Sequence, residues 1–282
     1  MAGQVSISYI QEFLQFSEGN EAIIGFSQGK FDRPLFYGGN LLNRRNSARA
    51  GWVLARNLLN ALGSVAIVED QELRGERRWK TEKGHAERLI EELDRLLEEL
   101  SISMKALDGF AVTIGPGSFS GLRVGLATVK GLAMATQRPV IPVSTLEVLA
   151  RNVSSPLHPV CPLLDAQREE AYAALFRRDE TGQWIRLLPD QVIAPGDLLK
   201  QLSGLTIFVG EGAVRYQALI QQRMGEKASF APAETQWPSA AIVAQMGLSR
   251  FLRGETAQAK EIAPIYLRRP DAEIKLEKGR VR

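Results

Sequence analysis

Between residues 84 and 100 the apolar side chains recur at helical spacing. Leucine or isoleucine stands at 89, 90, 93, 96, 97 and 100, and glutamate and arginine fill most of the intervening positions. An apolar stripe with this period is typical of an amphipathic helix. The sequence therefore predicts a helix over 84–100.

Short apolar runs with turn residues between them predict strands on both sides of this helix. Before it, 64–68 and 73–79 flank a polar turn and are expected to form a β-hairpin. After it, 110–114 and 140–143 are expected strands, joined by a helix over about 122–135. Strands that alternate with helices predict a parallel or mixed sheet with helices packed on it.

The second half of the chain repeats this scheme after an interruption at Ser154-Ser155-Pro156, which is a candidate boundary. The expected elements are strands at 160–164, 170–176, 184–188 and 205–209 and a closing helix at 239–253. We therefore expect an N-terminal lobe over 51–156 and a C-terminal lobe over 157–282, whose final helix could pack back on the first lobe. Residues 1–50 show no sustained period and are treated as an extension of uncertain order.

Composition places the chain among globular proteins. Hydrophobic residues make up 45% and charged residues 24% of its 282 positions, which argues against long disorder. The single cysteine, Cys161, excludes an intrachain disulfide and indicates a reducing compartment. Neither a signal peptide nor a run of about 18 apolar residues is evident, so we expect a cytoplasmic protein with no membrane contact. The net charge of +3 permits nucleic-acid contact without demanding it.

A glycine-rich loop, Gly-Pro-Gly-Ser-Phe-Ser-Gly at 115–121, lies where an expected strand leads into a helix. Backbone N–H groups at such a place can hold a phosphate. The candidate phosphate loop consists of Gly115, Gly117, Ser118 and Gly121. The loop matches neither a Walker A motif nor the dinucleotide fingerprint. We favour a packing role over ligand binding, in which the glycines permit a tight turn, Ser118 or Ser120 caps the helix, and Gly121 and Gly125 allow close packing.

Candidate catalytic and metal-binding residues do not form a recognisable constellation. His85 and His158 are far apart in sequence, and Ser118 lacks the elbow motif of a nucleophile. Asp165, between two expected strands, could be an acid for metal or phosphate chemistry, but a lone aspartate at a turn usually forms the turn. We expect no catalytic residue, no resident metal and no cofactor.

A series of motifs extends over about residues 63–272. In the first half these are Ser64 to Asp70, Gly84-His-Ala-Glu-Arg-Leu89, Leu107-Asp-Gly109, Ile114 to Ala127 and Val143-Ser-Thr-Leu-Glu147. In the second half they are Leu164-Asp-Ala-Gln-Arg168 with Tyr172, Gly210-Glu-Gly-Ala213 and Pro264-Ile-Tyr-Leu-Arg268. Together they resemble the TsaB family, also called YeaZ.

This resemblance implies an actin-like, RNase H-related (ASKHA) two-lobed α/β fold with mixed sheets flanked by helices. It also implies a non-catalytic dimerisation subunit of the bacterial machinery that forms N6-threonylcarbamoyladenosine in tRNA beside the anticodon. In the family, this subunit pairs with TsaD, which carries the metal and the transfer chemistry, and the ATPase TsaE joins that pair. Contact with tRNA would be indirect, and the chain alone could form a homodimer through the face built for its partner.

The resemblance assigns subunit contact to the helix at 84–100 and to the helix after the glycine loop. The expected interface residues are His85, Glu87, Leu89, Ile90, Leu93, Leu97, Gly121, Arg123 and Gly125. The width of the apolar stripe supports this assignment, although most such helices simply cover their own sheet.

The sequence departs from the family before Gly63. The family opens with a strand of the form Ile-Leu-Ala-Ile-Asp-Thr-Ser, whereas this chain has residues 52–62, in which 53–55 could begin the strand but the acid and hydroxyls are missing. A divergent start or a shifted reading frame would explain the difference. Two other functions stay open: an ATP-binding enzyme of the actin-like superfamily that uses the glycine loop and Asp165, and, least favoured, a glycoprotease.

Overall fold

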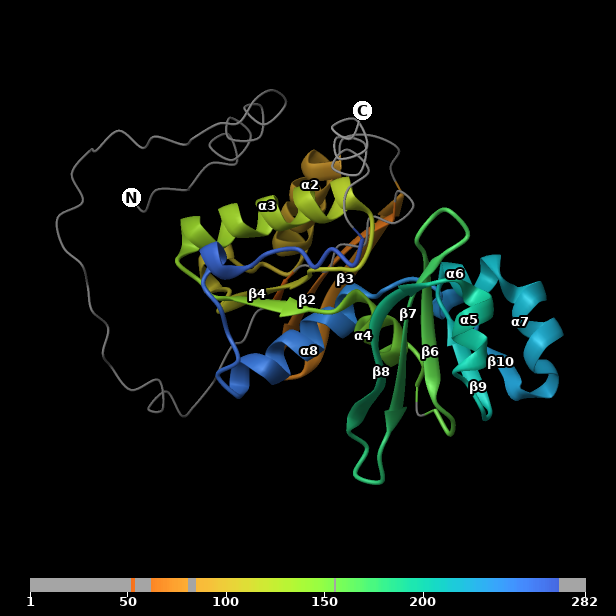
Figure 1. Ribbon diagram of the computed structural model, residues 1–282. Coiled ribbons are helices and arrows are strands. Elements are labelled where there is room, and N and C mark those ends of the chain that lie inside the picture. The colour runs from red at the N-terminus through yellow and green to blue at the C-terminus, as the bar shows by residue number, and fades with distance from the viewer. Residues whose placement is uncertain (1–51, 54–61, 81–84, 155, 269–282) are drawn as a thin grey trace, which may run out of the picture. The chain divides into compact units, whose positions relative to one another are not determined.

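The computed structural model describes residues 52–53, 62–80, 85–154 and 156–268 (Figure 1). Its strands form two five-stranded sheets. The first contains β1 Trp52–Val53, β2 Leu62–Glu69, β3 Glu72–Lys80, β4 Gly109–Thr113 and β5 Val140–Val143. The second contains β6 Val160–Asp165, β7 Ala171–Arg178, β8 Trp184–Ile193, β9 Thr206–Val209 and β10 Ala228–Phe230. The expectation for residues 1–50 lies outside the described residues.

The two sheets have the same topology. Their strand orders are β3-β2-β1-β4-β5 and β8-β7-β6-β9-β10. In each, the first strand of the sheet pairs antiparallel with the second and parallel with the fourth. Each sheet is therefore mixed, and each is built from a hairpin extended on one side by parallel strands, as the repeated sequence pattern indicated.

Helices follow the third, fourth and fifth strands of each sheet. The α-helices are α2 His85–Glu99, α3 Phe119–Thr136, α4 Thr145–Arg151, α5 Pro195–Lys200, α6 Glu211–Arg215, α7 Gln217–Met224 and α8 Ala240–Leu252. Short 3₁₀ helices span Met104–Ala106, Gly225–Lys227, Ala233–Thr235 and Ala259–Glu261. Within the described part of the chain, none of these helices has the length and apolarity needed to cross a membrane.

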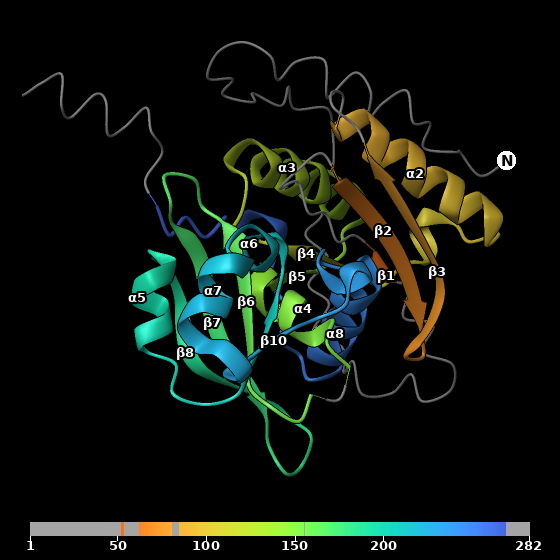
Figure 2. The same cartoon turned by 90° about the vertical axis from the view of Figure 1, so that its right-hand side faces the viewer.

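The helices that follow the last strand of each sheet are exchanged between the sheets. Helices α2 and α3 cover one face of the first sheet, and α8 covers its other face (Figures 1 and 2). Helix α4, which follows the last strand of the first sheet, packs through Leu146 and Leu149 on the second sheet. Helices α5, α6 and α7 cover the opposite face of that second sheet. The exchange joins the two sheets through buried apolar contacts.

Helix α8 approaches the first sheet very closely. Gly247 and Ala111 are both buried, and a Cβ atom added to Gly247 would lie less than 3.0 Å from Ala111 Cβ, a separation that real Cβ atoms essentially never show. The lack of a side chain on Gly247 therefore sets how tightly α8 packs on β4.

Strand β1 occupies the centre of the first sheet, between β2 and β4. Trp52 is paired with Val68 of β2, and Val53 with Phe110 of β4. Val53 is therefore part of a central strand, in agreement with the expectation that a strand could begin at 53–55. Residues 54 and 55, which would continue that strand, lie outside the described residues.

Several boundaries differ from the sequence-based expectations. Helix α3 begins at Phe119 rather than Leu122, because the Ser118 side chain caps it by accepting a hydrogen bond from the Gly121 N–H. Strand β8 continues to Ile193, five residues beyond the expected end at 188. Helices α4 to α7 were not predicted, since they have only 5 to 8 residues and show little periodicity.

Candidate functional site

The apolar stripe of α2 is buried within the chain itself. Four expected interface residues have almost no exposed area: Leu89 at 0%, Ile90 at 6%, Leu93 at 1% and Leu97 at 5%. They belong to a helix that packs on β2 and β3, where Gly75 leaves room for the Leu96 side chain. Their stripe covers the chain's own sheet, and this burial argues against the prediction that these four residues contact a partner.

The other expected interface residues divide between core and surface. Gly121 and Gly125 are buried in α3, so they too are unavailable to a partner. Glu87 and Arg123 are exposed and stay predictions. The side chain of His85 lies outside the described residues. What the outer surface of α2 presents is mainly charge, including exposed Glu91 and Arg95.

A buried carboxylate, Glu92, ties α2 to the neighbouring strand. Its side chain is 5% exposed and accepts hydrogen bonds from Arg77 Nε on β3 at 2.6 Å and Arg95 Nη1 at 3.0 Å. Arg88 Nη2 lies 2.6 Å from the same group, and Arg77 also bonds Glu99 at 2.5 Å. Burial alone raises the pKa of Glu92, but the hydrogen bond from Arg77 and the charges of the three arginines outweigh it and hold the pKa below its usual value.

Replacing Glu92 by glutamine should lower the free energy of unfolding by about 1–2 kcal/mol at neutral pH, since it removes hydrogen bonds to a charged acceptor. The pKa of Glu92 is lowered by folding, so its contribution is complete above the usual pKa and is lost as the pH falls through the lowered value. Urea unfolding at several pH values should show the gap between wild type and variant closing below about pH 4.5. The control, Glu91→Gln, should change stability by less than about 0.5 kcal/mol, because Glu91 is exposed. Equal effects at both positions would contradict this role.

The exposed apolar surface lies on α3 rather than α2. Val124, Ala127, Gly131 and Met134 recur at helical spacing along its outer side, where Ala127 is exposed, Met134 is 62% exposed, and Val124 and Gly131 are half-buried. Apart from the adjoining part of α3 itself, no atom of the described residues lies within 4 Å of a Cβ built on Gly131. This surface could admit another helix at short distance. The sequence signal for this surface is the run of small residues in α3. The packing interpretation of the sequence included Gly121 and Gly125 but not Ala127 and Gly131.

The glycine loop is held by the chain's own backbone. Gly115 has a φ of +119°, and a Cβ there would lie 2.6 Å from the Ile265 carbonyl oxygen, so only glycine fits. The Ile265 N–H donates to the Ile114 carbonyl at 2.7 Å, and the Thr145 N–H donates to the Gly115 carbonyl at 2.8 Å. Together with the Ser118 cap, these contacts give the loop a packing role and support the favoured interpretation over phosphate binding.

An aromatic and cationic cluster stands at the start of α3. The Arg123 guanidinium lies 4.2 Å from the centre of the Phe119 ring, and its Nε donates to the Tyr266 hydroxyl at 3.2 Å. The Phe119 and Tyr266 rings are 5.0 Å apart, and both remain more than one third exposed. The cluster joins the segment near the C-terminal end of the described chain to α3, beside its exposed apolar surface.

Asp165, the acid of the ATP-binding alternative, is engaged in an ion pair. Its carboxylate pairs with Arg215 and accepts hydrogen bonds from the backbone and side chain of Gln167. The connection between β6 and β7 is held by Arg268, which pairs with Glu170 and donates to the Ala166 carbonyl. Asp165 thus acts as a turn-former, as its position in the sequence suggested. In the described ranges, no group of three or more histidine, cysteine or acidic side chains could hold a metal ion.

Two sheets of identical strand order that exchange a helix define a two-lobed actin-like α/β protein. The family model described as "TsaD: tRNA N6-adenosine threonylcarbamoyltransferase" matches residues 79–276. The chain is 30% identical over 198 residues to a protein of Haemophilus influenzae named tRNA threonylcarbamoyladenosine biosynthesis protein TsaB, covering 66% of this chain and 81% of the relative. The TsaB protein of Bacillus subtilis is 27% identical over 79% of this chain and 96% of its own length.

A solved structure supports the fold. The chain matches the structure of YeaZ from Pseudomonas aeruginosa with a TM-score of 0.64 at 24% identity, covering 77% of this chain and all of that one. The chain belongs to the TsaB (YeaZ) family.

Proposed function

We propose that the chain is a non-catalytic subunit that binds and stabilises TsaD in the formation of N6-threonylcarbamoyladenosine in tRNA. The observation that carries the proposal is membership of the TsaB family over most of the described chain, since relatives of that name are biosynthesis proteins of this modification. The ion pair that occupies Asp165 is consistent with a chain that leaves the chemistry to its partner. Its site of action would be the cytoplasm.

The outer side of α3 is the surface that we assign to TsaD. The family model described as TsaD matches this chain from residue 79, so TsaD shares this part of the fold and can present a similar helix. Two related surfaces then meet in a nearly self-complementary way, as in a twofold dimer. Small residues such as Ala127 and Gly131 allow the helices to approach closely, and Met134 supplies apolar area at the end of the surface. Glu87 and Arg123 would contribute at its edges.

The same surface accounts for the other expected assemblies. Without TsaD, two copies of this chain could pair through α3, which would hide its apolar side chains from water. TsaE would then join only the pair formed with TsaD, so its binding should require TsaD.

Replacing Met134 by glutamate should abolish co-purification with TsaD or weaken it by about 100-fold, because the carboxylate would be desolvated in the contact. The matched control is Val214→Glu on α6, where an apolar side chain of similar exposure, 57% against 62%, is replaced in the same way. Val214→Glu should bind TsaD normally. If neither variant loses TsaD while the wild type binds it, the assignment to α3 is wrong. If the folded wild-type chain does not bind TsaD at all, the proposed function fails.

A further inference from the structure

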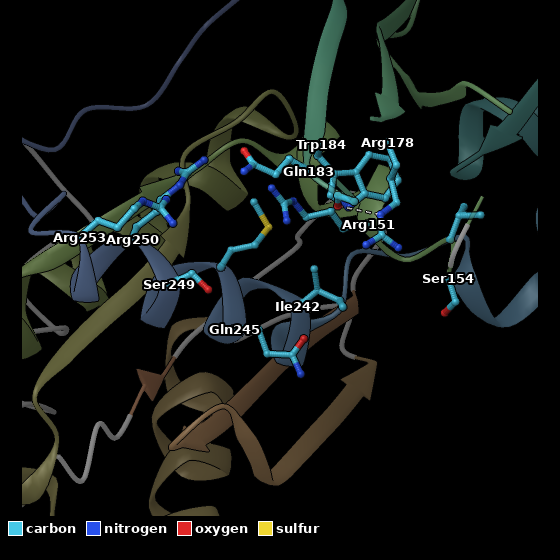
Figure 3. Close-up of a pocket in the computed structure, with 13 residues that line it drawn as sticks. Arg151, Ser154, Arg178, Gln183, Trp184, Ile242, Gln245, Ser249, Arg250 and Arg253 are labelled. Carbon is cyan, nitrogen blue, oxygen red and sulfur yellow. Dashed lines mark hydrogen bonds between the residues drawn. The ribbon is translucent and has the colours of Figure 1, made fainter. Parts of the chain in front are cut away.

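A large open pocket lies away from the proposed TsaD surface, among α4, the β7–β8 turn and α8 (Figure 3). Its volume is about 920 Å³. Arg151 comes from the end of α4, Arg178 and Trp184 flank the β7–β8 turn, and Arg250 and Arg253 come from the end of α8. Segments from both halves of the sequence thus bring cationic side chains to one hollow.

The pocket has an excess of positive charge. Within the described part of the chain, its lining contains four arginines and no carboxylate. Two carboxylates stand behind it: Glu147 pairs with Arg151 at 2.8 Å and Arg250 at 2.9 Å, and Glu255 pairs with Arg253 at 2.6 Å. A third carboxylate, Asp179 in the β7–β8 turn, accepts a hydrogen bond from the Gln183 N–H at 2.8 Å. The four lining arginines still outnumber these three carboxylates, and the positive excess favours an anionic ligand.

The lining arginines differ in their exposure and in their contribution to the stability of the fold. Arg250 is only 25% exposed and also donates to the Pro142 carbonyl at 2.6 Å, so it has a structural role. Arg253 is 57% exposed, and its ion pair with Glu255, which is 53% exposed, lies at the surface. Arg178 is exposed and donates its Nε to the Gly182 carbonyl at 2.9 Å, which orients the guanidinium at the turn. Arg178 and Arg253 can therefore contact a ligand without breaking any buried contact of the fold.

Neutral donors complete the lining. Gln183, Gln245 and Ser249 are exposed, and Figure 3 shows their side chains with those of the arginines and Trp184 around the hollow. Arginine matches phosphate geometry with two parallel hydrogen bonds, and amide and hydroxyl groups commonly donate to phosphate and sugar oxygens. Pockets that enclose a small molecule are mostly apolar. This hollow is open and polar, with cations spread along it, and therefore suits a chain of phosphates better.

We propose that this arginine pocket binds the phosphate backbone of RNA, so that the chain itself contacts the tRNA on which the complex acts. The inference rests on the proposed function, since that function places tRNA beside the chain. It replaces the expectation that tRNA is reached only through the partner. RNA is favoured over an acidic peptide because the lining combines guanidinium groups with an indole and sugar-directed donors, which a peptide of carboxylates would not use.

The test is the binding of a fluorescent tRNA transcript, with adenosine beside its anticodon, to the full chain alone and to its complex with TsaD. The variant is Arg178→Gln with Arg253→Gln. The control is Lys200→Gln with Arg223→Gln, which removes the same charge from α5 and α7, on the other face of the second sheet. We expect the pocket variant to weaken binding by about tenfold and to reduce the slope of log affinity against log salt by about two, with the control within about twofold of wild type.

Three outcomes would overturn the proposal. One is equal loss in pocket and control variants, which would mean a general charge effect. Another is unchanged RNA binding in the pocket variant. The third is calorimetry in which polyglutamate or ATP binds the wild type and loses affinity in the pocket variant while RNA binding does not. Affinity for TsaD is measured on the same samples, so a failure of the pocket and a failure of the proposed function give different results.

Discussion

Replacing Gly247 by valine should lower the free energy of unfolding by about 3 kcal/mol or more, the upper end of overpacking effects. The new side chain would meet Ala111 Cβ in the middle of the first sheet, and both positions are fully enclosed. The two atoms that it would approach, Cβ and Cα of Ala111, do not belong to a flexible side chain, so α8 would have to move away from β4. Urea unfolding of the full chain, followed by circular dichroism, measures the change.

Two further variants make this prediction specific. Gly131→Val places the same side chain in another helix, where no described atom beyond the adjoining part of that helix lies within 4 Å of the Cβ position, and should change stability by less than about 1 kcal/mol. Ala111→Gly combined with Gly247→Val removes the opposing methyl group and should recover part of the loss, as a double-mutant cycle would show. A stable Gly247→Val chain, or no recovery in the double variant, would contradict the close packing of α8.

Replacing Gly131 by tryptophan should weaken TsaD binding by about 100-fold, a loss typical of the most sensitive interface positions. Among the described residues the space beside Gly131 is open, so the indole should not disturb their fold, but it would separate two helices that need to approach within about 8–10 Å. Calorimetric titration of TsaD with the wild-type and variant chains gives the two affinities.

The matched control is Gly196→Trp in α5, where a Cβ also meets no described atom within 4 Å beyond the adjoining part of its own helix. It should bind TsaD as the wild type does. A second control, Gly131→Ala, adds one methyl group and should keep most of the affinity while raising helix stability slightly. Normal TsaD binding by Gly131→Trp would exclude α3 as the contact.

The stripe on α2 shows what a single sequence can and cannot reveal. Its period predicted the helix and its buried side, and the structure confirms both in Leu89 and Leu93. Periodicity cannot say whether a buried side meets its own sheet or another subunit, because the same side chains satisfy either contact. In this chain the buried side meets its own sheet, because Gly75 on β3 leaves room for the helix and Arg77 on β3 pairs with Glu92.

The repeated architecture was visible in the sequence, but the exchange of helices was visible only in part. Hairpin strands followed by mixed α/β elements predicted two related sheets, and the identical strand orders agree with this. Helix α4, with 7 residues, is too short to show a period, although it carries Leu146 and Leu149 onto the second sheet. The arginine pocket was also missed. Arg151, Arg178 and Arg253 are far apart along the chain, and only folding brings them together.

The role of the chain in the modification can be measured as the amount of N6-threonylcarbamoyladenosine in tRNA from a bacterial strain depleted of its own TsaB. Digested tRNA is analysed by mass spectrometry after expression of this chain, with TsaD of the same source, in wild-type and Gly131→Trp forms. The wild-type chain should restore the modified nucleoside, and Gly131→Trp, although folded, should not. Absence of the modified nucleoside with a folded wild-type chain present would contradict this role.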